Sequence, residues 1–249
     1  MSSDFVRYSE EIETFDRRLS QYLERIIHYW ETKVRESPAK EGSGRAVRGA
    51  HAKTIGVVRA EVEILSDVPA PYAQGVYAVP GRHDALIRFS NASNHLGVDA
   101  QLGPVLGFPI KIFDVGGTKL VDDEPDATTF DLVLKNHPTD LQVQLCTDLK
   151  AMPGNDSTVE WPEKLSSYVT VGRVHIPRQD ISAPENSDMA DALAFNQWRV
   201  TAEHRPLGEI MDVRRIYTAS AKVRREINHQ SQREPVSADE VLPLPKISG

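Results

Sequence analysis

A single histidine, His51, stands between a basic stretch and a run in which apolar and charged residues alternate. The stretch reads RAVRGAHAKTIGVVRAEVEIL, covers residues 45–65, and places Arg45 and Arg48 just upstream of the histidine. An imidazole titrates near neutral pH and can therefore act as a general base. A lone histidine is more often a surface or capping residue, so His51 needs partners elsewhere in the chain before it indicates a site.

Other common catalytic patterns are absent or weak. None of the eight histidines stands in an HExxH or His-x-His pattern, and neither common type of glycine-rich phosphate loop is present. The single cysteine, Cys146, lies within a run of leucines spaced by four, which favours a buried structural thiol over a nucleophile. The acids Asp122, Asp123 and Glu124 indicate a solvated turn, although their spacing leaves glycoside hydrolysis open.

Four segments, the first of which contains His51, occur in a fixed order along the chain. They are RGAHAK (48–53), IRFSNAS (87–93), FDLVLKNHP (130–138) and RRIYTASAKVRRE (214–226). Together they resemble the haem-binding signatures of the catalase-like superfamily, which includes catalases, small catalase-related peroxidases and allene oxide synthases. The run FNQWRVTAEHRPLG (195–208) is also similar to one in the small catalase-related proteins. The resemblance implies a protein that binds haem b, with ferric iron.

The resemblance assigns the peroxide side of the haem to His51, Asn136 and Ser90. His51, with Arg48 three residues before it, matches the essential distal histidine, and Asn136 matches the distal asparagine. His51 would take the proton of a hydroperoxide and return it to the leaving oxygen, while Asn136 donates a hydrogen bond to the peroxide. Ser90 would accept a hydrogen bond from the imidazole and set its tautomer. Ala50 stands where catalases carry a bulkier branched residue, which implies a roomier pocket and a preference for an organic donor over rapid dismutation.

The resemblance assigns the other side of the haem to Tyr217, which matches the proximal tyrosinate and would be the ligand of the iron. Arg224, two helical turns further on, is expected to bind a propionate bidentately, and Arg48 and Arg88 are the other propionate candidates. The family's usual arginine lies four residues before the tyrosine, where this chain has a valine. Arg214, three residues before Tyr217, lies on nearly the same helix face and would take its place.

Taken singly, each of these residues has an ordinary structural interpretation, and only the ordered set favours haem. Three functions follow from the set. The first is a peroxidase related to catalase that acts on peroxide and a small organic substrate. The second is a haem enzyme that rearranges or dehydrates a fatty-acid hydroperoxide, or catalyses another specialised haem reaction. The third is a non-catalytic barrel that binds haem or a small molecule.

The elements that must position these residues follow from the hydrophobic periods. Apolar residues recur at three- and four-residue steps over 4–35 and 207–228, which predicts amphipathic helices. Between 56 and 134 the period is two, with short runs such as VVRAEVEIL, ALIRFS, FPIKIF and TFDLVL. The pattern predicts an α+β fold, in which an antiparallel β-barrel core carries an N-terminal helical arm and C-terminal helices. Further helices are predicted from Leu141, Leu145 and Leu149, and near 161–169.

We expect a helical arm over residues 1–38, a single haem domain over 39–232 and an extended tail over 233–249. The Pro-, Gly- and Ser-containing stretch 36–45 is interpreted as a linker. The helical arm is expected to dock on the domain or on a second copy of the chain, which would form a homodimer.

The composition limits which partners the protein is expected to bind and in which cellular compartment we expect it. The net charge of −7 argues against nucleic-acid binding, and no apolar run is long enough to insert into a membrane. The single cysteine rules out a disulfide within the chain. The acidic first residues do not resemble a secretory signal, so we expect a cytoplasmic protein.

Overall fold

A six-stranded antiparallel sheet and two long helices form an α+β fold in the computed structural model of the chain. The structure describes residues 17–49, 51–91, 106–117, 120, 129–135, 140–154, 156, 158–181, 189–208, 211, 214–231 and 234–242. The strands are β1 (Thr54–Ile64), β2 (Gly81–Asn91), β3 (Leu106–Ile112), β4 (Phe130–Lys135), β5 (Asp140–Val143) and β6 (Val169–His175). The long helices are α1 (Arg17–Lys40) and α4 (Arg215–Ile227), and three short 3-10 helices are η1 (Gly75–Tyr77), η3 (Ala202–His204) and η4 (Ala238–Glu240).

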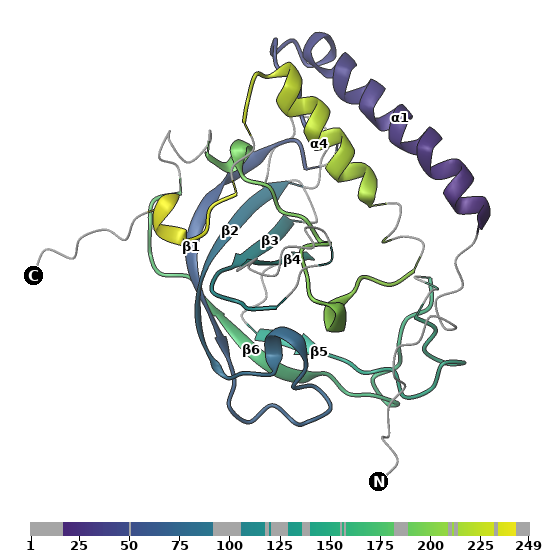
Figure 1. Cartoon of the computed structure of the whole chain (residues 1–249), viewed down its shortest axis with the longest axis vertical. Helices are drawn as coiled ribbons and strands as arrows, with labels where there is room; N and C mark the ends of the chain where they lie inside the picture. The colour runs from purple at the N-terminus through teal and green to yellow at the C-terminus, as the bar shows by residue number, and fades with distance from the viewer. Residues whose placement is uncertain are drawn as a thin grey trace, which may run out of the picture.

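The sheet has the strand order β4-β3-β2-β1-β6-β5 and curves into a half-barrel (Figure 1). The two long central strands, β1 and β2, pair from Thr54↔Ser90 to Ile64↔Gly81. Of β1, only the last four residues, 61–64, pair with β6. Within the described residues, β4 and β5 are the two edges of the sheet and do not pair with each other. The expected antiparallel sheet is therefore present, and closure into a full barrel stays a prediction.

Beyond the residues of β1 that pair with β6, a glutamine side chain forms hydrogen bonds to the β1 backbone. Gln179 accepts a hydrogen bond from the Arg59 backbone N–H at 2.7 Å and donates one to the Arg59 carbonyl at 2.8 Å. The amide thus bonds to the backbone as a neighbouring strand would.

The two faces of the sheet are buried against different partners, as the period-two alternation of the strands predicts. One face forms the main core, which includes Val58, Ala60, Val62, Ile64, Ala85, Ile87, Phe108, Ile110 and Ile112. The opposite face carries a second apolar cluster, which includes Val57, Leu86, Phe113, Ala190, Leu193, Ala238 and Val241. That opposite face, called the outer face below, also carries Arg88, Ser90 and Lys111.

The helices α1 and α4 lie side by side, with α4 between α1 and the sheet (Figure 1). The expected docking of the N-terminal helix on the domain is confirmed by this contact. A small cluster of Val34, Ala46, Val223 and Ile227 fills the space between the two helices and the chain that follows α1.

The end of α4 has the hydrogen bonds of a Schellman motif. His229 takes a left-handed conformation with φ 53°. Its N–H donates to the Glu226 carbonyl at 3.2 Å, and the N–H of Gln230 donates to the Arg225 carbonyl at 2.9 Å. The carbonyls of Arg225 and Glu226 are therefore satisfied, and the side chain of Asn228, at the C-cap, bonds to Ala46 in the chain after α1.

Several local predictions are wrong. Leu141 lies in strand β5 and Leu149 is exposed in a turn, so the leucines do not form a helix. Residues 161–168 form turns rather than a helix, and α1 runs through Pro38 to Lys40, so the first part of the expected linker is helical. Cys146 consequently lies in the irregular chain after β5, where its Sγ donates a hydrogen bond to the Met152 carbonyl at 3.2 Å.

Residues 234–242 cross the outer face of the sheet. Ala238 and Val241 join the second apolar cluster. Asp239 forms an ion pair with Arg59, and Glu234 forms one with Arg199. Among the described helices, none has the length and apolar character needed to cross a bilayer.

Candidate functional site

His51 and Ser90 meet over a glycine on the outer face of the sheet. The distance between Ser90 Oγ and His51 Nδ1 is 3.3 Å, so the contact expected between these two residues is present. Ser90 pairs with Gly107 on the neighbouring strand β3. A Cβ at Gly107 would lie 2.5 Å from Ser90 Oγ and 2.7 Å from His51 Nδ1, so only glycine leaves room for the imidazole.

The backbone of His51 is in the left-handed region, with φ 54°. This conformation is uncommon for a residue with a side chain and costs on the order of 1 kcal/mol relative to the right-handed region. It turns the chain from the segment after α1 into β1, and so brings the imidazole back over Ser90. Non-glycine residues with such strain cluster at functional sites.

Three arginines from three parts of the chain gather around one aspartate and are called the arginine cluster below: Arg48, Arg88 and Arg224, with Asp191. Arg48 Nη1 donates to Asp191 Oδ1 at 2.7 Å and to Thr54 Oγ1 at 2.9 Å. Arg224, only 1% exposed, donates through Nη2 to the Asp191 carbonyl at 2.7 Å. The three arginines expected to bind propionates are thus brought together.

The arginine cluster holds more positive than negative charge. Its four side chains carry three positive charges and one negative charge. Burial, followed by the charges of Arg48 and Arg224, lowers the pKa of Arg88 well below its ordinary value. Burial, followed by the charge of Arg48, lowers the pKa of Arg224 to about 9. The Nε atoms of Arg88 and Arg224 have no hydrogen-bond partner in the described structure. These features suit the binding of an additional anion.

Tyr217 lies in the first turns of α4, on the stripe that leads to the arginine cluster. Its side chain is 42% exposed, whereas Ser220 and Arg224 further along the same stripe are buried. Arg224 is seven residues on, about 10 Å along the helix axis at 1.5 Å per residue. Arg214 caps the start of α4, and its carbonyl accepts the Tyr217 N–H at 3.0 Å. Arg214 is therefore a neighbour of the tyrosine along the helix and lies outside the arginine cluster.

Phe195 connects the arginine cluster to a buried ion pair on strands β3 and β4. Its ring lies under the Arg88 guanidinium at 5.2 Å and the Lys111 ammonium at 5.7 Å. Lys111 and Asp131 are fully buried, with Lys111 Nζ 2.7 Å from Asp131 Oδ1. The other Asp131 oxygen accepts the Asn196 N–H at 2.9 Å, which holds the segment next to Phe195 against the sheet.

Two of the expected site residues, Ala50 and Asn136, lie outside the described residues. The structure adds residues that the sequence reasoning missed: Asp191, Gly107 and Phe195. Gly107 had a signal, since a glycine within a strand often marks a close approach of other atoms. Asp191 had none: it lies in a short helical stretch, residues 189–192, too short for a periodic pattern to indicate which side chain faces the site.

The described residues contain no group of three or more His, Cys, Asp and Glu side chains arranged to hold a metal ion. A search of protein-family models finds no match to this chain, and a search of curated proteins finds none either.

Proposed function

We propose that this chain is a haem-dependent enzyme with a closed, catalase-like barrel, which cleaves the O–O bond of a peroxide and oxidises a small organic donor. The observation that carries the proposal is the arginine cluster beside the His51–Ser90 pair. Arg48, Arg88 and Arg224 exceed Asp191 by two charges, and haem b carries two propionates. The two Nε donors without a partner would be free to bind those carboxylates.

The His51–Ser90 contact supports a role for His51 in proton transfer. With Ser90 Oγ as acceptor, the proton of the neutral imidazole stays on Nδ1 and leaves Nε2 unprotonated. Nε2 then takes the proton of the hydroperoxide and gives it to the leaving oxygen, so that His51 returns to its starting state. Asn136 is the proposed donor to the peroxide.

Tyr217 is the proposed anionic ligand of the iron, with Arg214 beside it at the start of α4. When bound, a ferric haem supplies the redox centre at which the O–O bond is cleaved. The organic donor supplies the electrons that complete the turnover.

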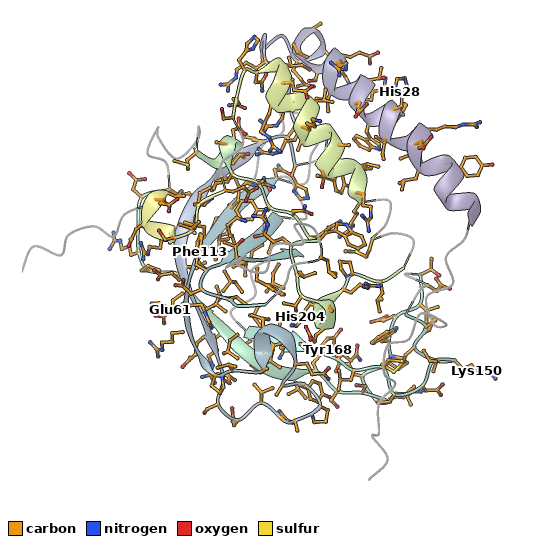
Figure 2. The ribbon with its side chains drawn as sticks, viewed as in Figure 1. His28, Glu61, Phe113, Lys150, Tyr168 and His204 are labelled. Carbon is orange, nitrogen blue, oxygen red and sulfur yellow. The ribbon has the colours of Figure 1, made fainter. Side chains whose placement is uncertain are left out.

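A haemin titration of the purified protein tests the cofactor. We expect stoichiometric uptake with a ferric, high-spin Soret spectrum, which Tyr217→Phe changes or removes. Tyr168→Phe is the matched control, because Tyr168 is similarly exposed but lies next to β5 and β6, away from α4 (Figure 2). A protein that takes up no haemin overturns the proposal.

Two strand β2 arginines test the proposed propionate site in the same titration. Arg88→Leu should weaken haemin binding at least tenfold, since it removes a charge-assisted hydrogen bond. Arg82→Leu should leave it unchanged, because Arg82 is 66% exposed at the far end of the strand. Equal effects of the two substitutions would reject the arginine cluster as the anion site.

The role of His51 is tested with peroxide. His51→Ala should retain haemin but lower the rate of reaction with peroxide by roughly 10²–10⁴, the usual contribution of a general base. An unchanged rate would reject His51 as the base.

A further inference from the structure

The indole of Trp30, on α1, contacts both sides of the proposed site. On one side it lies against Gly49, two residues before His51: a Cβ at Gly49 would be 2.6 Å from Cε3 and 2.7 Å from Cζ3 of the indole. On the other side it meets Tyr217 edge to face, with ring centroids 6.4 Å apart and an interplanar angle of 71°. Trp30 therefore joins the chain that leads to His51 with the proposed iron ligand.

The chain between α1 and His51 is held in place by both helices. Ser37, near the end of α1, accepts the Val47 N–H at 2.9 Å and donates to the Val34 carbonyl at 2.6 Å. Asn228, at the end of α4, accepts the Ala46 N–H at 2.8 Å and donates to the Ala46 carbonyl at 2.9 Å. The position of Gly49 relative to the indole is therefore fixed by hydrogen bonds at both helix ends.

We infer that Trp30 is a positioning residue for Tyr217, and that α1 is a wall of the proposed haem site. The inference rests on the proposed function for the role of Tyr217 as a ligand. Tyr217 is 42% exposed, so its ring can move unless a neighbour holds it. The edge-to-face contact fixes the plane of the ring, and Gly49 is a glycine because the indole occupies the space of its side chain. An aromatic pair of this kind is worth a factor of about two to ten in an equilibrium.

The contact can be measured without haem. The indole ring current should shift the ring-proton resonances of Tyr217, which Tyr217→Phe assigns by difference. Trp30→Leu should remove the shift and Trp30→Phe should retain part of it. Tyr22→Leu, a change at an exposed aromatic residue of the same helix, should leave the resonances in place. If Trp30→Leu fails to fold, Gly49→Ala serves as the second variant, since its Cβ must displace the indole.

The haemin-loaded protein then tests the consequence for the ligand. Trp30→Leu should weaken haemin binding about two- to tenfold and alter the ferric tyrosinate spectrum, and Trp30→Phe should restore both. Unchanged Tyr217 resonances and an unchanged haemin spectrum in Trp30→Leu would overturn the inference. A wild-type protein that binds no haemin would overturn the proposed function instead, while the ring-proton shifts still decide whether Trp30 positions Tyr217.

Discussion

His51 occupies a backbone conformation that glycine adopts more readily, yet it carries a large polar side chain. His229, at the end of α4, has nearly the same φ, is exposed, and ends the helix. The two histidines therefore share a backbone cost but differ in what surrounds the imidazole. A comparison between them separates the cost of the conformation from the use of the side chain.

At either histidine, substitution by glycine should give a higher free energy of unfolding than substitution by alanine. His51→Gly should be more stable than His51→Ala by about 1 kcal/mol, because glycine enters the left-handed region without the Cβ clash. Both variants lose the Ser90 contact, so the difference between them reports the backbone alone. Urea denaturation of the two variants measures it.

His229→Gly is the control and should be more stable than His229→Ala by a similar amount. Of the glycine variants loaded with haemin, His51→Gly should lose peroxide reactivity and His229→Gly should retain it. If His51→Gly were no more stable than His51→Ala, the left-handed conformation would carry no cost at this position.

The sequence could predict the positively charged residues of the site but not the negative charge that partly neutralises them. Arg48, Arg88 and Arg224 were expected from a motif resemblance, and they do come together. Their counter-charge, Asp191, lies in a short helical stretch, residues 189–192, where too few residues form a periodic pattern to indicate which side chain faces inward. The contact of Trp30 with Tyr217 depends on the packing of two helices far apart in the chain, which neither helix encodes alone.

At the level of elements, the period-two strands were predicted well because their two faces are both buried but chemically different. The helix predicted from Leu141, Leu145 and Leu149 was wrong for a simple geometric reason. A spacing of four is also a multiple of two, so these residues share one face of a strand as well as one face of a helix. Pairing with β6 decides in favour of the strand at Leu141, and that contact is not visible locally.

Two amide side chains each bind a backbone segment through two hydrogen bonds and are called clamps below. Because only one of the segments leads to the proposed site, the two clamps can be compared. Asn228 makes two hydrogen bonds to the backbone of Ala46, and Gln179 makes two to the backbone of Arg59. Asn228→Ala should lower the free energy of unfolding by roughly 2 kcal/mol, at about 1 kcal/mol for each hydrogen bond. It should also speed amide exchange at Ala46.

Gln179→Ala should have a similar effect on global stability but should speed exchange at Arg59 rather than at Ala46. Because Asn228 holds the chain that carries Arg48 and His51, only its variant should also weaken haemin binding. Accelerated exchange at Ala46 in both variants would mean that the two clamps are not independent.

For the whole molecule, the buried phenol of Tyr77 sets an alkaline limit to stability. Burial in the main core raises its pKa from 10.0 to about 12. Below pH 10 the phenol is neutral in the folded and unfolded states and has no effect on their balance. Between pH 10 and 12 the unfolded chain ionises while the folded one does not, so the free energy of unfolding falls, by on the order of 2–3 kcal/mol at the upper end.

Tyr77→Phe should remove this part of the pH dependence. Urea unfolding of both proteins at pH 8 and at pH 11 measures it, and the stability difference between them should move in favour of the variant at the higher pH. A difference that stays constant with pH would show that the phenol is not protected from ionisation in the folded state.

The chain over 234–242 also determines when the proposed site can assemble. Glu234 pairs with Arg199, beside the segment that carries Asp191 and Phe195, and Asp239 pairs with Arg59 of the sheet. During synthesis these two acids leave the ribosome after every other described element. All six strands have left the ribosome by then, so the sheet can form first, and the segment that supplies the counter-charge of the arginine cluster gains its ion pair with Glu234 only afterwards. Assembly of the site is therefore expected to follow the folding of the sheet.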